Sequence, residues 1–201
     1  MPDGPGESAD VWRRLFPRGL ELWVAESDGA CAAAYAAAED DTLENRTRIV
    51  VGDQGNPTDL DRWLAESGGD FDAVIDDGGH RNSLINASFY ALWPALKPGG
   101  VYFIEDLSVG RAKGFDDADF VMADVMGGWI DQLLITERLD ERTWGPQPTY
   151  AATEGRRRRF PLPDDVAFVH CGPNVCALGK SRRPGIRVAF PGLDVKFRAG
   201  Y

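Results

Sequence analysis

The sequence has no apolar run long enough to span a membrane, and its start, Met1-Pro2-Asp3-Gly4, is not that of a signal peptide. It also lacks positive charge overall: the formal net charge of −10 argues against general nucleic-acid binding. Cysteine is scarce, and the three cysteines, Cys31, Cys171 and Cys176, form no even disulfide framework. These absences predict a soluble, cytoplasmic protein of a reducing compartment, with no membrane or nucleic-acid partner.

The residues present in quantity are those that build a core. A chain of 201 residues with 43% hydrophobic content and six tryptophans fits one globular domain. Its charge is uneven, because residues 1–155 carry a net −17 and residues 156–201 a net +7. The basic run Arg156-Arg157-Arg158-Arg159 is typical of a solvated loop, with phosphate or partner binding as the alternative. We expect one domain over residues 1–180 and a tail over residues 181–201.

Alternating apolar strands and helices predict an α/β fold. Strands are expected at 20–25, 48–51, 71–76 and 101–105, and helices at 7–16, 30–38, 57–67, 82–96 and 119–135. Short connections between these elements favour a doubly wound, mostly parallel sheet. Residues 141–163 predict a loop, and residues 166–178 predict an antiparallel hairpin that closes the sheet. The hairpin is favoured over a metal site at His170, Cys171 and Cys176.

Two of the expected strands run directly into acidic residues. The first ends in Asp76-Asp77-Gly78-Gly79-His80, and the second ends in Glu105-Asp106. Ligand sites in open α/β sheets lie outside the carboxyl ends of adjacent strands, so Asp77, Glu105 and Asp106 should converge beside His80. Carboxylates this close raise one another's pKa unless a cation lies among them. An all-oxygen ligand set favours Mg²⁺ or Mn²⁺ over zinc.

Four motifs in order carry a resemblance to a known family. They are Gly52-Asp53-Gln54, Ile75-Asp76-Asp77-Gly78-Gly79-His80, Leu96-Lys97-Pro98-Gly99-Gly100 and Ile104-Glu105-Asp106-Leu107. From about residue 6 to residue 180 the chain resembles class I S-adenosylmethionine-dependent methyltransferases. Within that class it is similar to the metal-dependent branch of macrolide-sugar O-methyltransferases and cephalosporin-hydroxylase-like proteins. The resemblance implies a Rossmann-like sheet and transfer of a methyl group from S-adenosylmethionine to a small-molecule hydroxyl, aided by Mg²⁺ or Mn²⁺.

The resemblance also implies roles for individual residues. It implies metal binding by Asp77, Glu105 and Asp106, and removal of the acceptor's hydroxyl proton by His80. On the cofactor side it implies Glu26 at the ribose, Asp53 and Gln54 near the adenine, and Gly4, Gly6 and Asp76 as further cofactor residues. Gly79 stands where the family motif has serine, which loosens the turn that aims His80. The alternatives are a structural His80, and a Glu26 and Asp53 that merely end strands in solvent.

The chain departs from the family at its start. The family begins with an apolar strand that runs into a glycine-rich loop, whereas this chain starts within that loop, at Gly4-Pro5-Gly6-Glu7-Ser8. We therefore expect an N-terminally truncated sheet, in which each unpaired buried backbone group costs ~1–3 kcal/mol. Another segment could replace the strand, and Ile186-Arg187-Val188-Ala189-Phe190 is one candidate. If nothing replaces it, residues 1–201 should bind S-adenosylmethionine weakly.

Several functions stay open at this point. The leading one is the metal-assisted O-methyltransferase. The second is a non-catalytic remnant of the methyltransferase fold that serves as a binding or interaction module, and cofactor binding would distinguish the two. An accessory or hydrolytic role with the same metal site is a third, because fold does not fix chemistry. The sequence identifies neither the methyl acceptor nor whether the chain forms a homo-oligomer.

Overall fold

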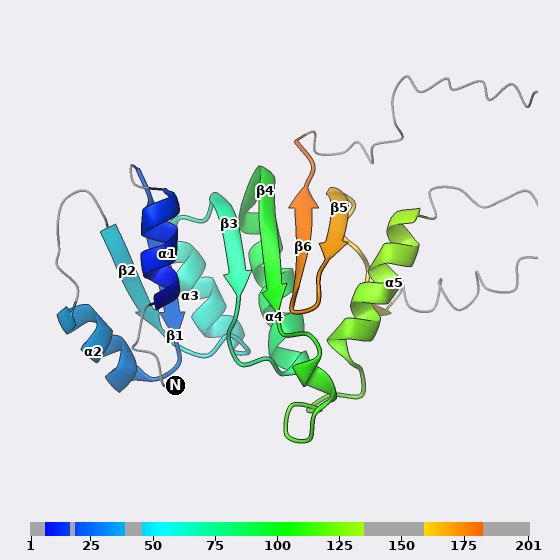
Figure 1. The fold of residues 1–201 in the computed structure, drawn as a ribbon, viewed down its shortest axis with the longest axis horizontal. Helices are drawn as coiled ribbons and strands as arrows, with labels where there is room; N and C mark the ends of the chain where they lie inside the picture. The colour runs from blue at the N-terminus through cyan, green and yellow to red at the C-terminus, as the bar shows by residue number, and fades with distance from the viewer. Residues whose placement is uncertain (1–6, 17–18, 39–45, 135–158, 183–201) are drawn as a thin grey trace, which may run out of the picture. The chain divides into compact units, whose positions relative to one another are not determined.

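The computed structural model describes residues 7–16, 19–38, 46–134 and 159–182 (Figure 1). In chain order the elements are α1 (Glu7–Leu15), β1 (Glu21–Glu26), α2 (Gly29–Ala38), β2 (Arg46–Val51), α3 (Pro57–Ser67), β3 (Phe71–Asp76), α4 (Asn82–Leu92), η1 (Trp93–Ala95), β4 (Leu96–Glu105), η2 (Val109–Arg111), α5 (Met122–Leu134), β5 (Val166–Cys171) and β6 (Val175–Lys180). None of the helices in these ranges is long and apolar enough to cross a membrane.

The chain divides into two compact units. One comprises Met1–Gly69 and Ser83–Ala95, and the other comprises Asp70–Asn82 and Leu96–Tyr201. The described strands form two separate hydrogen-bonded ladders, β1-β2 in the first unit and β3-β4-β6-β5 in the second. The predicted order of alternating strands and helices is confirmed, while a single domain over residues 1–180 stays a prediction.

The first unit holds the parallel pair β1-β2, which runs in register from Glu21 opposite Arg46 to Glu26 opposite Val51. Val50, Leu60 and Trp63 form its buried cluster, with Trp23, Ala87, Ala91 and Leu92 packed against them. Helix α3 begins as predicted, because the Asn56 side chain accepts the Thr58 N–H at 3.0 Å. It ends at Gly68, whose φ of 75° suits glycine.

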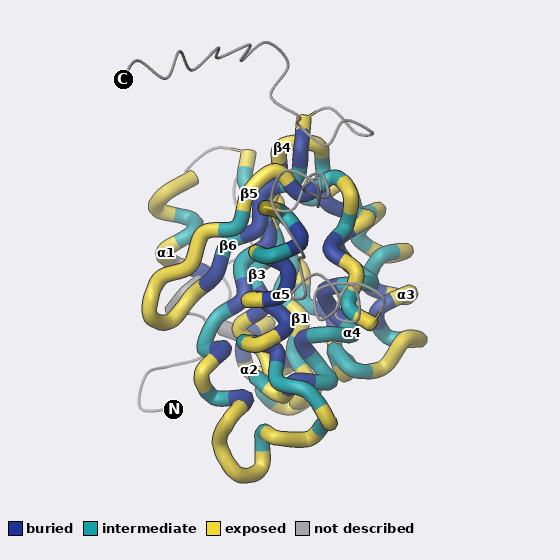
Figure 2. The backbone as a smooth tube through the Cα atoms, turned by 90° about the vertical axis from the view of Figure 1, so that its right-hand side faces the viewer, coloured by how far each residue is buried: buried dark blue, intermediate teal, exposed yellow. Residues whose placement is uncertain are grey.

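The second unit holds the four-stranded sheet and α5 (Figure 1). β3 runs parallel to β4, and β6 runs antiparallel to both β4 and β5, which confirms the predicted C-terminal hairpin. The largest apolar side chains that are fully buried in this unit are Trp129, Tyr102, Ile104, Met122 and Leu178. In Figure 2 strands β4 and β6 are accordingly mainly dark blue and teal.

β3 is more exposed than predicted. The sequence predicts a buried parallel strand at 71–76, yet Asp72 and Ala73 are exposed and Asp76 alone is buried. The reason is position, since β3 lies at one edge of its described ladder and pairs with β4 alone. Its apolar residues suit a strand with a neighbour on each side. Composition does not determine whether both neighbours are present.

The predicted helix over residues 82–96 ends early, at Leu92, and the one-turn helix η1 follows it. Pro94 explains this, because α conformation is disfavoured just before a proline. β4 then begins at Leu96 instead of after Gly100. The β3–β4 register shifts over this stretch, and a Cβ on Gly100 would lie 3.0 Å from the Asp72 carbonyl oxygen. Glycine therefore permits the close approach of the two backbones.

The sequence predicts no even disulfide framework and a reducing compartment, yet two of the three cysteines are bonded. Cys171 and Cys176 are bonded, and they are direct partners in the β5–β6 register with Cα atoms 4.1 Å apart. The short turn between the strands brings the two side chains to the same place, which the number of cysteines does not reveal. The bond also excludes their thiols from a metal site. Cys31 is a free thiol.

Candidate metal centre

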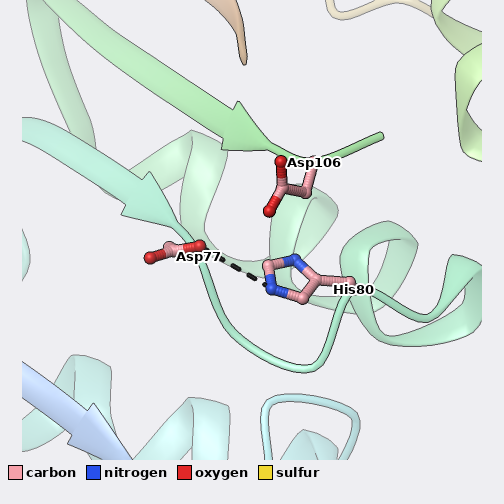
Figure 3. Close-up of side chains that lie close together, drawn as sticks. All are labelled: Asp77, His80 and Asp106. Atoms are coloured by element: carbon pink, nitrogen blue, oxygen red, sulfur yellow. Dashed lines mark ion pairs between the residues drawn. The ribbon is translucent and has the colours of Figure 1, made fainter. Parts of the chain in front are cut away.

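Asp77, His80 and Asp106 meet at the carboxyl ends of β3 and β4 (Figure 3). One potential ligand atom from each side chain lies within 4.8 Å of the others. Asp77 directly follows β3, and Asp106 directly follows β4. Parallel pairing of the two strands places their ends at the same sheet edge. The structure thus brings these three side chains together, while their roles stay predictions.

The backbone at this centre is unusual at two of its three residues. His80 and Asp106 have φ angles of 50° and 49°, in the left-handed region that few non-glycine residues adopt. Such conformations persist where the surroundings fix them. The His80 Nε2 atom lies 3.7 Å from the Asp77 Oδ1 atom, so the turn after β3 points the imidazole back toward the strand end (Figure 3).

Both backbone polar groups of Asp106 make hydrogen bonds. Its N–H donates to the carbonyl of Asn174, at 2.7 Å, and its carbonyl accepts the N–H of Val109, at 2.8 Å. Asn174 lies in the β5–β6 turn, next to the disulfide. The sequence contains no signal for this contact, because it depends on β6 pairing with β4.

Glu105 lies beside the three clustered side chains without being one of them. Its pKa is raised, first by burial and then by the negative charges of Asp77 and Asp106, with an opposing effect of His80. The prediction that at least one of the three carboxyls has a raised pKa is confirmed at Glu105, although burial contributes more than the neighbouring charges. Because a nearby cation would favour the ionised form, the centre is electrostatically suited to one.

Asp76 faces away from this centre. Its side chain is buried, and the Tyr102 hydroxyl donates to its Oδ2 atom at 3.3 Å. Successive residues of a strand point to opposite faces, so Asp76 points into the protein interior while Asp77 is exposed at the strand end. This hydrogen bond within the protein gives no evidence of cofactor binding. The cofactor role of Asp76 therefore stays a prediction.

The other predicted cofactor residues that the structure describes belong to the first unit. The Glu26 carboxylate accepts the Asp28 N–H at 2.8 Å, and the Asp53 carboxylate accepts the Gly55 N–H at 2.8 Å. Gln54 donates to the Ser88 hydroxyl at 3.4 Å. Since β1 and β2 are paired, the ends that carry Glu26 and Asp53 lie together. Gly4, Gly6, residues 156–158 and most of the tail are outside the described residues.

No protein-family model matches the chain. Comparison with individual known proteins nevertheless finds relatives. The chain is 40% identical over 114 residues to demethylmacrocin O-methyltransferase of Streptomyces fradiae, covering 57% of this chain and 26% of that protein. It is 32% identical over 183 residues to the 8-demethyl-8-(2-methoxy-alpha-L-rhamnosyl)-tetracenomycin-C 3'-O-methyltransferase of Streptomyces olivaceus, covering 90% and 42%. The relatives of this chain are O-methyltransferases. This confirms the predicted resemblance.

A solved structure agrees. The MycE methyltransferase from the mycinamycin biosynthetic pathway, in complex with Mg, SAH and mycinamycin VI, matches with a TM-score of 0.65 at 28% identity. The match covers 90% of this chain and 41% of that one. The fold is therefore the Rossmann-like methyltransferase fold, as predicted, and the chain spans less than half the length of these relatives.

Proposed function

We propose that this chain belongs to an S-adenosylmethionine-dependent O-methyltransferase that acts on a hydroxyl group of a small molecule with the aid of a divalent metal. The observation that carries the proposal is the cluster of Asp77, His80 and Asp106, whose ligand atoms lie within 4.8 Å of one another. The relatives support the reaction type, and the Mg and SAH held by a solved relative support the cofactors. The cytoplasmic location stays a prediction.

The residues present fit a hard divalent cation. Asp77 and Asp106 offer carboxylate oxygens, and the raised pKa of Glu105 reflects negative charge that a cation would neutralise. Oxygen ligands of this kind suit Mg²⁺ or Mn²⁺. Asp77, Glu105 and Asp106 would hold the ion. Once bound, it supplies a positive charge that lowers the pKa of the acceptor hydroxyl.

His80 has the chemistry and the place to take the hydroxyl proton. Its imidazole lies beside the two carboxylates, so an acceptor oxygen bound at the metal centre would be within its reach. S-adenosylmethionine, when bound, would supply the methyl group, and the deprotonated acceptor oxygen would receive it. This step depends chiefly on in-line positioning. Glu26 would bind the ribose hydroxyls, and Asp53 and Gln54 would lie near the adenine.

Metal-linked thermal stability tests the centre. With Mg²⁺ or Mn²⁺ at about 100 times the dissociation constant, the wild-type protein should gain about 2.7 kcal/mol of stability. Asp77→Ala should abolish the gain. Asp61→Ala, which removes an exposed carboxylate of α3, is the matched control and should keep it. An equal gain in wild type and Asp77→Ala would contradict the proposed metal site.

Calorimetry with S-adenosylmethionine separates the proposal from a non-catalytic remnant. If Glu26 and Asp53 bind the cofactor, its affinity should fall in Glu26→Ala and in Asp53→Ala. Asp77→Ala should leave it nearly unchanged, because that residue is assigned to the metal. An absence of S-adenosylmethionine binding by wild type would favour the non-catalytic alternative.

A further inference from the structure

Asn82, two residues after His80, is completely buried and uses its whole side-chain amide in hydrogen bonds. Its Nδ2 atom donates to the carbonyl of Gly110, at 2.8 Å, and to that of Phe115, at 3.2 Å. Its Oδ1 atom accepts the N–H of Met122 at 2.8 Å. Met122 is the first residue of α5, and a helix leaves the first N–H groups without partners of its own. One side chain therefore ties three points after β4 to the turn that carries His80.

The segment that Asn82 holds begins at the metal centre. The carbonyl of Asp106 accepts the N–H of Val109 at 2.8 Å, and Gly110 is the next residue along the chain. Residues 111–114 are exposed, and the loop after β4 is mostly yellow in Figure 2, whereas Gly110 itself is buried. The Asn82 amide thus anchors the exposed residues at both ends, at Gly110 on the Asp106 side and at Phe115 on the other.

Gly110 shows how close this contact is. A Cβ atom at that position would lie 2.4 Å from the Asn82 Oδ1 atom and 3.1 Å from its Cγ atom. Any other residue at position 110 would displace the amide, so the loop backbone and the Asn82 side chain are matched to each other. Sequence patterns give no hint of this, because an asparagine at the start of a helix is ordinarily an exposed or capping residue.

We propose that Asn82 is a positioning residue for the metal centre, whose amide fixes the Asp106 turn against the His80 turn. The inference rests on the proposed metal site. His80 and Asp106 both have left-handed backbone conformations, which need support from their surroundings. Without the amide, the carbonyls of Gly110 and Phe115 lose a buried donor and the loop has to rearrange. The ligand atoms of Asp106 and His80 would then no longer share one site.

Mn²⁺ affinity, measured by electron paramagnetic resonance, tests this without turnover. Asn82→Asp keeps the size of the side chain but replaces the donor group with an acceptor, and Asn82→Ala removes the amide without adding charge. Residues that orient ligands typically contribute about 10–100-fold to metal affinity, so both variants should lose Mn²⁺ affinity by that order. The affinity of Asn82→Asp should not be restored by raising stability with an osmolyte.

Gln132 offers a matched control. It is also a buried amide, and it donates to the Phe160 carbonyl at 3.0 Å and accepts the Leu162 N–H at 2.9 Å, with no acidic cluster attached. Gln132→Glu and Gln132→Ala should lower thermal stability but leave Mn²⁺ affinity within about twofold of wild type. Equal losses of affinity in the Gln132 and Asn82 variants would contradict the positioning role and indicate general destabilisation.

Amide exchange of the wild-type protein tests the same idea if the Asn82 variants fail to fold. Mg²⁺ should slow exchange of the Met122 N–H, which is bonded to Asn82, and leave that of Leu162 unchanged. Unaltered Met122 exchange in the metal-bound protein would overturn the inference. A wild-type protein that binds no Mn²⁺ would contradict the metal site and the positioning role together, whereas wild-type binding with unchanged affinity in Asn82→Asp contradicts the positioning role alone.

Discussion

His80 can act on the metal or on the acceptor, and its replacement separates the two roles. As a general base, it contributes about 10²–10⁴-fold to kcat, so His80→Ala should lose that much rate and keep its Mg²⁺ affinity. As a ligand it would favour Mn²⁺ over Mg²⁺, and His80→Ala should lose metal affinity instead. Turnover and Mn²⁺ affinity, both measured on His80→Ala, distinguish the general base from the metal ligand. His170→Ala, at the other histidine of the chain, is the control and should change neither.

Glu105 gives the metal-free protein a distinctive dependence on pH. Its pKa is raised above the ordinary value of 4.5, so the folded state holds the proton more tightly than the unfolded state. Stability is therefore greatest while Glu105 is protonated and falls as the pH rises from about 4.5 through the folded pKa. Glu105→Gln stays uncharged and should be more stable than wild type above that window, by less than about 1 kcal/mol because the carboxyl is partly exposed.

Thermal unfolding with a chelator present, at about pH 4 and about pH 8, measures this difference. The two proteins should have similar midpoints at the lower pH and separate at the higher one. Adding Mg²⁺ at the higher pH should reverse the order, because the glutamine offers the ion no charge. If the variant is less stable than wild type in chelator at both pH values, the carboxylates do not repel one another as described.

At the scale of elements, the β5–β6 hairpin links the disulfide to the metal centre. Cys171 and Cys176 close a short loop, and the loop-entropy model assigns such a bond about 2 kcal/mol of stability. The double replacement with serine should lower the thermal midpoint accordingly, and reduced wild type should match it. The same midpoint for oxidised and reduced wild type would show that the bond does not constrain the unfolded chain, and Cys31→Ser is the control.

For the whole molecule, the two ladders should differ in local stability. Among the strands that the structure describes, β1 and β2 form a two-stranded sheet, whereas β4 and β6 are the inner strands of a four-stranded one. Two strands alone are marginally stable in water, so the amides of β1 and β2 should exchange at least about tenfold faster than those of β4 and β6. Hydrogen exchange followed by mass spectrometry measures this, and equal protection of the two ladders would contradict it.

Ligands should change this exchange pattern unit by unit. S-adenosylmethionine should slow exchange at the ends of β1 and β2, where Glu26 and Asp53 lie, and Mg²⁺ should slow it at the ends of β3 and β4. Hydrogen exchange of wild type should be measured with each ligand added alone, so that each change in protection is assigned to one unit. Asp77→Ala is the control for Mg²⁺. Protection of β1 and β2 by Mg²⁺ alone would contradict this assignment of residues.

The sequence by itself determined the elements and the residues worth testing. The order of strands and helices, the caps of α3 and the acidic ends of β3 and β4 follow from apolar periodicity and local turn chemistry, which act between near neighbours in the chain. The tertiary structure alone decided the exposure of β3, the Cys171–Cys176 bond and the hydrogen bonds of the Asn82 amide. The exposure of β3 and the contacts of Asn82 depend on which distant segment lies opposite, and such pairing leaves no periodic signal in the sequence. The cysteine bond depends instead on the exact register of the β5–β6 hairpin, which the number of cysteines does not reveal.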